Sequence, residues 1–211
     1  MSPEQQNASQ QEILATAARL FSRHGFEGVS LSAIASAAGT SKANVLYHFT
    51  SKDQLYIQVM ETCCSQVLGS LESELGGDGP IEERIRAFAA SHLEHLLEKP
   101  ELNRLIMREL QHGDGDRGRE LAQGVLRQHF NGIVEHIRSA QGDGVIRADI
   151  DPAILVLTLF GGNQFFFAHR DHLRTNENCR NFIEDPEHFT RQLVDILFNG
   201  VALNPAQTSE E

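Results

Sequence analysis

Start and stop signals for helices recur along nearly the whole 211-residue chain. The first helical segment carries its apolar residues at intervals of three or four, at Ile13, Ala17, Leu20 and Phe21. This spacing places them on one helix face, and Gly25 follows as the stop. Segments that alternate apolar and polar residues between turns are absent. The sequence therefore predicts an all-α fold of about nine helices.

N-cap residues and prolines set the remaining helix boundaries. Ser30 and Ser41 each precede a short helix, and Gly39 separates the two. Asp151-Pro152 and Asp185-Pro186 each combine an N-cap with a proline at the first helical position. The helices after the first are therefore expected at residues 31–38, 42–48, 52–75, 80–98, 100–111, 117–140, 152–169 and 186–199.

Charge is distributed unevenly along the chain. The net charge is −11, but residues 1–52 hold four basic and three acidic residues, a net of +1. The remainder holds 14 basic and 26 acidic residues, a net of −12. Because an acidic surface repels a polyanion, any contact with DNA must come from the amino-terminal part. The charge distribution permits such a contact without proving it.

The second and third predicted helices fit a helix-turn-helix, in which the third helix enters the major groove of DNA. Small residues at positions 37–39 allow the two helices to approach closely at the turn. Four apolar residues are placed to pack the helices together, namely Ile34, Ala35, Ala38 and Val45. Three residues then point outward, namely Lys42, Asn44 and Tyr47.

The same segment resembles a known family. Gly39–Phe49, followed by Ser51–Leu55, closely resembles the end of the DNA-binding domain of the TetR family of regulators. Ala17–Phe21 and Val29–Ala35 look like the first two helices of that domain. The resemblance covers about residues 12–58, and the rest of the chain matches only in being helical.

The resemblance implies a transcriptional repressor that a small-molecule effector releases from a palindromic operator in double-stranded DNA. The alternatives are an activator, a repressor that needs a co-repressor, and a helical small-molecule-binding or scaffold protein with a vestigial helix-turn-helix. We expect a DNA-binding domain over residues 1–55 and a ligand-binding and dimerisation domain over residues 56–204. A polar tail over residues 205–211 completes the chain.

Seven DNA contacts are implied by the resemblance. Hydroxyl groups and lysines suit phosphate oxygens, and an amide can pair with adenine. The family usually contacts phosphate at the positions of Ser30 and Ser32 and the DNA backbone at those of Tyr47, His48 and Lys52. Lys42 and Asn44, early in the third helix, are at positions available to base edges.

Structural roles for these residues stay open. Lys42 and Lys52 are alternatively solvated charges, Tyr47 a half-buried packing residue, and His48 a brace between the third and fourth helices. The family often has tyrosine where this chain has Leu46, so one usual hydroxyl contact is missing.

Polar groups interrupt the apolar helices of the second half, which is the usual make-up of a small-molecule site. Asn163 and Gln164 are the strongest pointers, because buried amides need partners. These amides alternatively form hydrogen bonds at a subunit interface or face solvent, and His92 is alternatively a core or surface residue. The candidate effector-binding residues are Phe88, His92, Met107, Arg108, Phe130, Asn163, Gln164 and Phe167.

The last two long helices carry more apolar residues than one protomer needs to bury. These residues are Ile154, Leu157, Phe160 and Phe165, followed by Phe189, Leu193, Ile196, Leu197 and Phe198. In the TetR family the corresponding helices pair with those of a second copy, so the resemblance implies a homodimer. A twofold dimer also suits a palindromic operator.

Other functions find no support in the sequence. Nucleophile elbows, P-loops, dinucleotide fingerprints and complete metal-ligand sets are absent, so we expect no enzyme, cofactor or metal. The three cysteines have no CxxC spacing, the first residues have no secretory signal, and apolar runs of 18 residues are missing. We therefore expect a cytoplasmic protein without a membrane partner.

Overall fold

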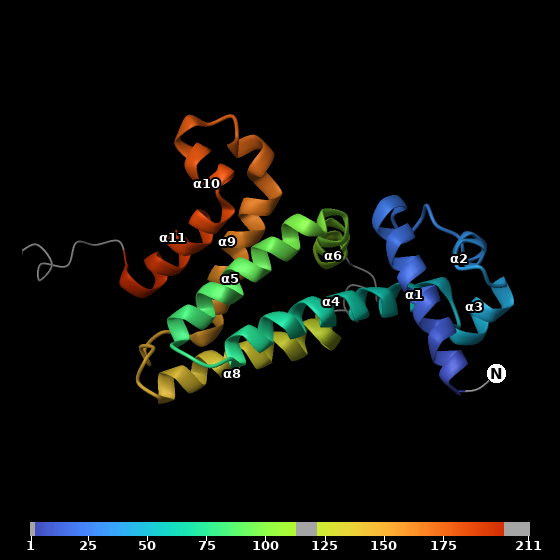
Figure 1. Cartoon of the computed structure of the whole chain (residues 1–211), viewed down its shortest axis with the longest axis horizontal. Helices are drawn as coiled ribbons and strands as arrows, with labels where there is room; N and C mark the ends of the chain where they lie inside the picture. The colour runs from blue at the N-terminus through green and yellow to red at the C-terminus, as the bar shows by residue number, and fades with distance from the viewer. Residues whose placement is uncertain (1–2, 113–121, 201–211) are drawn as a thin grey trace, which may run out of the picture. The chain divides into compact units, whose positions relative to one another are not determined.

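The computed structural model describes residues 3–112 and 122–200, and within them the chain forms ten α-helices and no β-strand. The helices appear in Figure 1 as α1 (Pro3–His24), α2 (Leu31–Ala37), α3 (Lys42–His48), α4 (Lys52–Gly76), α5 (Ile81–Glu98), α6 (Pro100–His112), α8 (Arg127–Gly142), α9 (Pro152–Leu173), α10 (Arg180–Glu184) and α11 (Pro186–Asn199). The predicted all-α class is confirmed. The tail at 205–211 lies outside the described residues.

The start and stop signals act where the sequence places them. The four expected N-caps each accept a backbone N–H at 2.9–3.1 Å, namely Ser30, Ser41, Asp151 and Asp185. After α1 and α2, Gly25 and Gly39 adopt φ values of +71° and +63°, in the left-handed region that favours glycine. Local capping chemistry therefore sets these boundaries.

Three elements differ from expectation. Helix α1 begins at Pro3, in polar turns that carry no apolar stripe to reveal them. The five-residue α10, with a 3-10 turn at Glu177–Cys179, is too short for a helical period to show. A π-helical turn at Ala122–Leu126, kinked at Gly124, precedes α8, and residues 117–121 of the expected helix lie outside the described part.

The described residues fall into two compact units. The first lies within Met1–Gly69 and Lys99–Phe130, and the second within Ser70–Glu98 and Asn131–Glu211. Helices α4 and α8 each begin in the first unit and end in the second. The first unit therefore contains α6 in addition to the expected three-helix domain.

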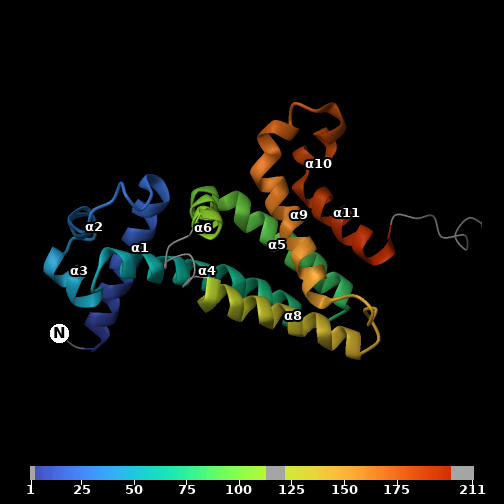
Figure 2. The same ribbon diagram turned by 180° about the vertical axis from the view of Figure 1, so that it is seen from behind.

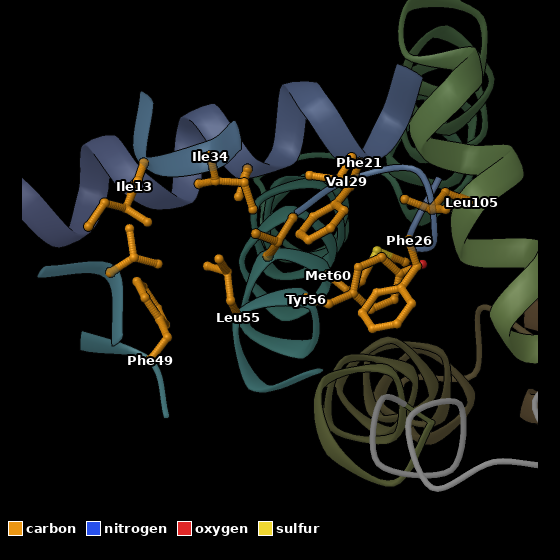
Figure 3. Packing of buried hydrophobic residues seen from close by; sticks show 14 of the residues in the cluster. Ile13, Phe21, Phe26, Val29, Ile34, Phe49, Leu55, Tyr56, Met60 and Leu105 are labelled. Atoms are coloured by element: carbon orange, nitrogen blue, oxygen red, sulfur yellow. The ribbon is translucent and has the colours of Figure 1, made fainter. Parts of the chain in front are cut away.

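The core of the first unit joins α1, α2, α3, the start of α4, and α6 (Figure 3). Ile34, Ala35 and Val45 are buried in it as predicted, and Ala38 packs against it. Leu105 from α6 reaches the same cluster and is itself buried. Helix α6 thus shares its apolar core with the helix-turn-helix.

The second unit is built around α5, which packs against α9 and α11 (Figures 1 and 2). Buried residues from α5, α9 and α10 meet in one cluster, formed by Leu93, Leu96, Phe166, Phe167 and Ile183. Among the described helices, α9 is long and apolar enough by length and composition to cross a membrane. One side of α9 lies in this core, where Asn163 is buried against α5.

Candidate nucleic-acid interface and effector site

The turn between α2 and α3 is tight. The Thr40 N–H donates to the Ala35 carbonyl at 2.9 Å, and Gly39 supplies the left-handed backbone. Helix α3 buries Val45 on one side and exposes Lys42, Leu46 and Tyr47 on the other. A short helix with a buried back and an exposed front is the geometry with which a helix-turn-helix enters the major groove.

Asn44 lies at the edge of this exposed face and is half-buried. Its Nδ2 atom donates to Ser9 Oγ at 3.0 Å and to Thr40 Oγ1 at 2.9 Å. Neither partner is expected from the sequence. Thr40 lies only four residues from Asn44, but it precedes the Ser41 N-cap and so falls outside the helical spacing of α3. Ser9, 35 residues away in the polar first turns of α1, left no signal.

Ser30, the N-cap of α2, and Ser32 are both exposed. Ser30 Oγ accepts the Ala33 N–H at 3.1 Å, so the cap uses an oxygen lone pair of Ser30. The hydroxyl hydrogen of Ser30 remains available as a donor, because a serine hydroxyl both donates and accepts. Ser32 lies in the first turn of the same helix.

Tyr47 and His48 differ in their surroundings. Tyr47 is 69% exposed, which contradicts its alternative role as a half-buried packing residue. The His48 ring packs edge-on against Tyr47, with ring centroids 5.2 Å apart, and its Nε2 atom is buried without a hydrogen-bond partner. His48 thus packs against its neighbour on α3, and a brace between α3 and α4 stays a prediction.

Lys52 occupies the first position of α4 and is half-buried. Its Nζ lies 4.1 Å from the centroid of the Phe26 ring, within the range of a cation–π interaction. This contact links the start of α4 to the loop that follows α1. Lys52 is therefore more than a solvated charge, whereas Lys42 on α3 is exposed.

A polar contact joins α4 to α6 within the first unit. The Tyr56 hydroxyl donates to Glu109 Oε1 at 3.0 Å. Burial, followed by the Glu109 charge, raises the pKa of Tyr56, so the phenol stays protonated and donates. Arg108, an expected effector contact, is exposed and lies beside Gly25, with a guanidinium nitrogen 3.3 Å from where a Cβ would stand.

The second unit holds a buried polar pair. Asn163 Nδ2 donates to the Ala89 carbonyl at 2.8 Å and to His92 Nδ1 at 3.1 Å, while its Oδ1 is buried without a partner. Burial, with a smaller effect of His95, lowers the pKa of His92 to about 3. The His92 ring also packs edge-on against Phe160, with centroids 4.5 Å apart. A neutral imidazole that accepts at Nδ1 carries its hydrogen on Nε2.

The candidate effector residues are therefore divided between the two units. Phe88, His92, Asn163, Gln164 and Phe167 belong to the second unit, where all but the half-buried Gln164 are buried. Asn163 bonds within its own protomer, so the alternative that it faces solvent or a subunit interface is wrong. The other three belong to the first unit, namely Met107, Arg108 and Phe130.

An apolar stripe follows the exposed side of α9. Ile154, Leu157 and Phe165 are exposed there, and Ile196 is exposed on α11. Phe165 also stacks on His169, with ring centroids 4.2 Å apart. Exposed apolar side chains at helical spacing are typical of a surface that binds another protein.

Sequence comparisons assign both parts of the chain. Residues 13–59 match the family described as "Bacterial regulatory proteins, tetR family", and residues 78–167 match the "Tetracyclin repressor-like, C-terminal domain". The HTH-type transcriptional regulator RutR of Escherichia coli K12 is 29% identical over 164 residues, which cover 76% of this chain and 74% of RutR. The regulator AcrR of Shigella flexneri is 39% identical over 66 residues, 31% of this chain and 30% of AcrR.

Solved structures share the fold. The transcriptional regulator FadR from Bacillus subtilis aligns with a TM-score of 0.73 at 14% identity, over 91% of this chain and 99% of FadR. The TetR-family regulator PfmR from Thermus thermophilus aligns with a TM-score of 0.63 at 20% identity, over 90% of this chain and 99% of PfmR. With both of its parts matched, the chain belongs to the TetR family and is a transcriptional regulator.

Proposed function

We propose that the chain acts as a homodimeric repressor, bound to a palindromic operator until a small-molecule effector releases it. The observation that carries this proposal is the exposed front of α3, where Lys42, Leu46 and Tyr47 point outward while Val45 anchors the helix in the core. Residues 1–55 form the DNA-binding domain, and residues 56–204 bind the effector and form the dimer. The protein works in the cytoplasm, without enzymatic activity.

The DNA contacts come from α2, α3 and the start of α4. Ser30 and Ser32 donate to phosphate, Lys42 and Asn44 face base edges, and Tyr47, His48 and Lys52 hold the DNA backbone. The exposure of Ser30, Lys42 and Tyr47 supports these roles. The net charge of only +1 over residues 1–52 means that individual contacts, rather than bulk attraction, provide the affinity.

A homodimer forms through α9 and α11. The stripe of Ile154, Leu157 and Phe165 would be covered by the same stripe of a second copy, because a twofold interface pairs one surface with itself. Ile196 on α11 extends this surface. The dimer then presents two α3 helices to the two half-sites of a palindrome.

The effector binds in the second unit, at Phe88, His92, Asn163, Gln164 and Phe167. The unpartnered Asn163 Oδ1 supports this proposal, because a buried acceptor gains free energy from a ligand that donates to it. The structure of Bacillus subtilis FadR was determined in complex with stearoyl-CoA, which gives an example of a small-molecule ligand on this fold.

Release follows from a shift between two populations of the dimer. Helix α4 runs from the helix-turn-helix into the second unit. A conformational change in the second unit can therefore reach the DNA-binding domain through α4. The effector needs only a higher affinity for the released state. A coupling free energy of about 1–3 kcal/mol changes the operator affinity several-fold to a hundredfold.

The test is a gel shift with the DNA upstream of the protein's own gene. Lys42→Ala and Tyr47→Ala should each weaken a specific complex by about tenfold, and higher salt should weaken it further. Lys99→Ala is the matched control, since it removes the same charge from a residue outside α2–α4 and should leave binding unchanged. Binding that ignores both substitutions would contradict the DNA contacts assigned to α3, and the absence of any shift would support a scaffold protein with a vestigial helix-turn-helix.

The effector is sought by thermal shift with a panel of metabolites that includes stearoyl-CoA. Each compound that stabilises the protein is then titrated into the operator complex. A repressor releases the DNA, whereas a regulator that needs a co-repressor binds it more tightly. A cognate compound that leaves operator affinity unchanged would contradict the proposed mechanism.

A further inference from the structure

We propose that Ser9 sets the base specificity of the reading helix α3 by occupying the amide hydrogens of Asn44 together with Thr40. Asn44 then acts towards DNA as a hydrogen-bond acceptor only, and it selects a base that carries an exocyclic amino group. This inference rests on the proposed function, in which Asn44 faces a base edge.

The donors of Asn44 are fully used within the protein. An asparagine amide has two N–H donors and one carbonyl acceptor. Nδ2 gives one hydrogen to Ser9 Oγ at 3.0 Å and the other to Thr40 Oγ1 at 2.9 Å. The Asn44 backbone N–H is bonded to the Ser41 cap at 3.1 Å. The group that remains for DNA is the side-chain oxygen Oδ1.

This arrangement changes the expected recognition of DNA. An asparagine that reads adenine through two bonds donates to N7 and accepts from the N6 amino group. Without a free donor, Asn44 can only accept, and in the major groove both adenine N6 and cytosine N4 offer a hydrogen. Guanine and thymine present carbonyl oxygens, which repel Oδ1. One position in each half-site is therefore expected to accept adenine or cytosine, and to disfavour guanine and thymine by roughly five- to tenfold.

Ser9 is the residue through which this chain restricts the hydrogen bonding of Asn44. It lies before the segment that matches the DNA-binding domain of the family, which begins at residue 13. Helix α1 extends back to Pro3 and so places the Ser9 hydroxyl against α3. Removal of that hydroxyl frees one Asn44 N–H while Thr40 still holds the other, so the amide regains the donor that adenine N7 requires.

The experiment selects duplex DNA from a randomised pool with the full-length chain. The wild type should enrich a palindrome in which one position per half-site is adenine or cytosine. Ser9→Ala should narrow that position to adenine, and Ser9→Thr, which keeps a hydroxyl, should retain the wild-type mixture. Asn44→Ala should lose the preference at this position alone. Ser73→Ala, an exposed serine on α4 in the second unit, is the control and should leave the enriched sequence unchanged.

Three other outcomes of this selection would each contradict a specific part of the proposal. A wild-type preference for adenine alone that Ser9→Ala does not alter would overturn the role of Ser9. An enriched palindrome that Asn44→Ala leaves intact would overturn the acceptor role of Asn44, while the proposed repressor function would stand. A wild-type protein that enriches no sequence would overturn both. Urea unfolding of Ser9→Ala shows whether a lost preference instead reflects a lost fold.

Discussion

The Tyr56 hydroxyl donates to Glu109 at 3.0 Å and so joins α4 to α6 inside the unit that carries the reading helix. Leu105 on α6 is buried in the core of the same unit. Helix α6 is therefore held in this unit by both a polar and an apolar contact. Helix α6 also follows α5 of the second unit after a single residue, Lys99. The helix-turn-helix is thus connected to the second unit through α4 and through the α5–α6 junction.

Loss of the Tyr56–Glu109 bond should destabilise the first unit. Tyr56→Phe keeps the buried ring but removes the hydroxyl that donates to Glu109, so we expect the free energy of unfolding to fall by about 1–2 kcal/mol. Urea unfolding followed by circular dichroism measures this loss. Tyr47→Phe, which removes a hydroxyl from an exposed ring, is the control and should change the midpoint little. Equal midpoints for both variants would show that the bond contributes nothing to stability.

Burial of His92 should make the protein sensitive to mild acid. The folded pKa is lowered from 6.5 to about 3, so above pH 6.5 the ring is neutral in both states and stability is unaffected. As the pH falls below 6.5, His92 binds a proton in the unfolded chain but stays neutral in the folded chain until near pH 3. The free energy of unfolding therefore declines. Between pH 6.5 and 5, before most carboxylates titrate, this loss amounts to about 2 kcal/mol.

The measurement is the free energy of unfolding of wild type and His92→Gln at pH 6.5 and at pH 5. Glutamine keeps an amide that can accept from Asn163 but has no proton to gain. The difference between the two proteins should therefore shrink at pH 5, since only the wild type loses the histidine contribution. A constant difference would mean that His92 titrates normally in the folded state.

Two substitutions of Ser30 can distinguish its effect on stability from its effect on DNA binding. Its Oγ caps α2 by accepting the Ala33 N–H, so Ser30→Ala should cost about 1 kcal/mol of stability and also weaken operator binding. Ser30→Asp supplies an equally good N-cap but cannot donate, and its charge repels phosphate. We expect this variant to unfold like the wild type and to bind operator DNA more weakly than Ser30→Ala. Wild-type affinity in Ser30→Asp would remove Ser30 from the DNA contacts.

The sequence predicts those parts of the fold that depend on bonds between near neighbours. An N-cap such as Ser41 or Asp185 bonds to a backbone N–H three residues ahead, so it can be recognised from residue type and position alone. The burial of Val45 followed from helical period. The short α10 could not be recognised, because its five residues span little more than one turn and show no apolar repeat, and its burial depends on packing against α9 and α11.

The candidate site divides in the same way. The outward direction of Lys42 and Tyr47 follows from their spacing relative to Val45. Ser9 lies 35 residues from Asn44, and Glu109 lies 53 residues from Tyr56, so neither of these two bonds leaves a local pattern. The unpartnered Oδ1 of Asn163 likewise depends on how α9 faces α5, which only the folded chain determines.

The exposed stripe on α9 provides the test of the dimer. Leu157 and Phe165 are 58% and 59% exposed, so a charge at either position costs little in a monomer but would be buried without a partner in a dimer. Leu157→Glu should therefore give a folded monomer by analytical ultracentrifugation and weaken binding to the palindrome, because each monomer then contacts one half-site. Val145→Glu is the matched control, since Val145 is 60% exposed but lies outside α9 and α11. This variant should remain dimeric. A dimer that survives Leu157→Glu and Phe165→Glu would place the subunit interface elsewhere.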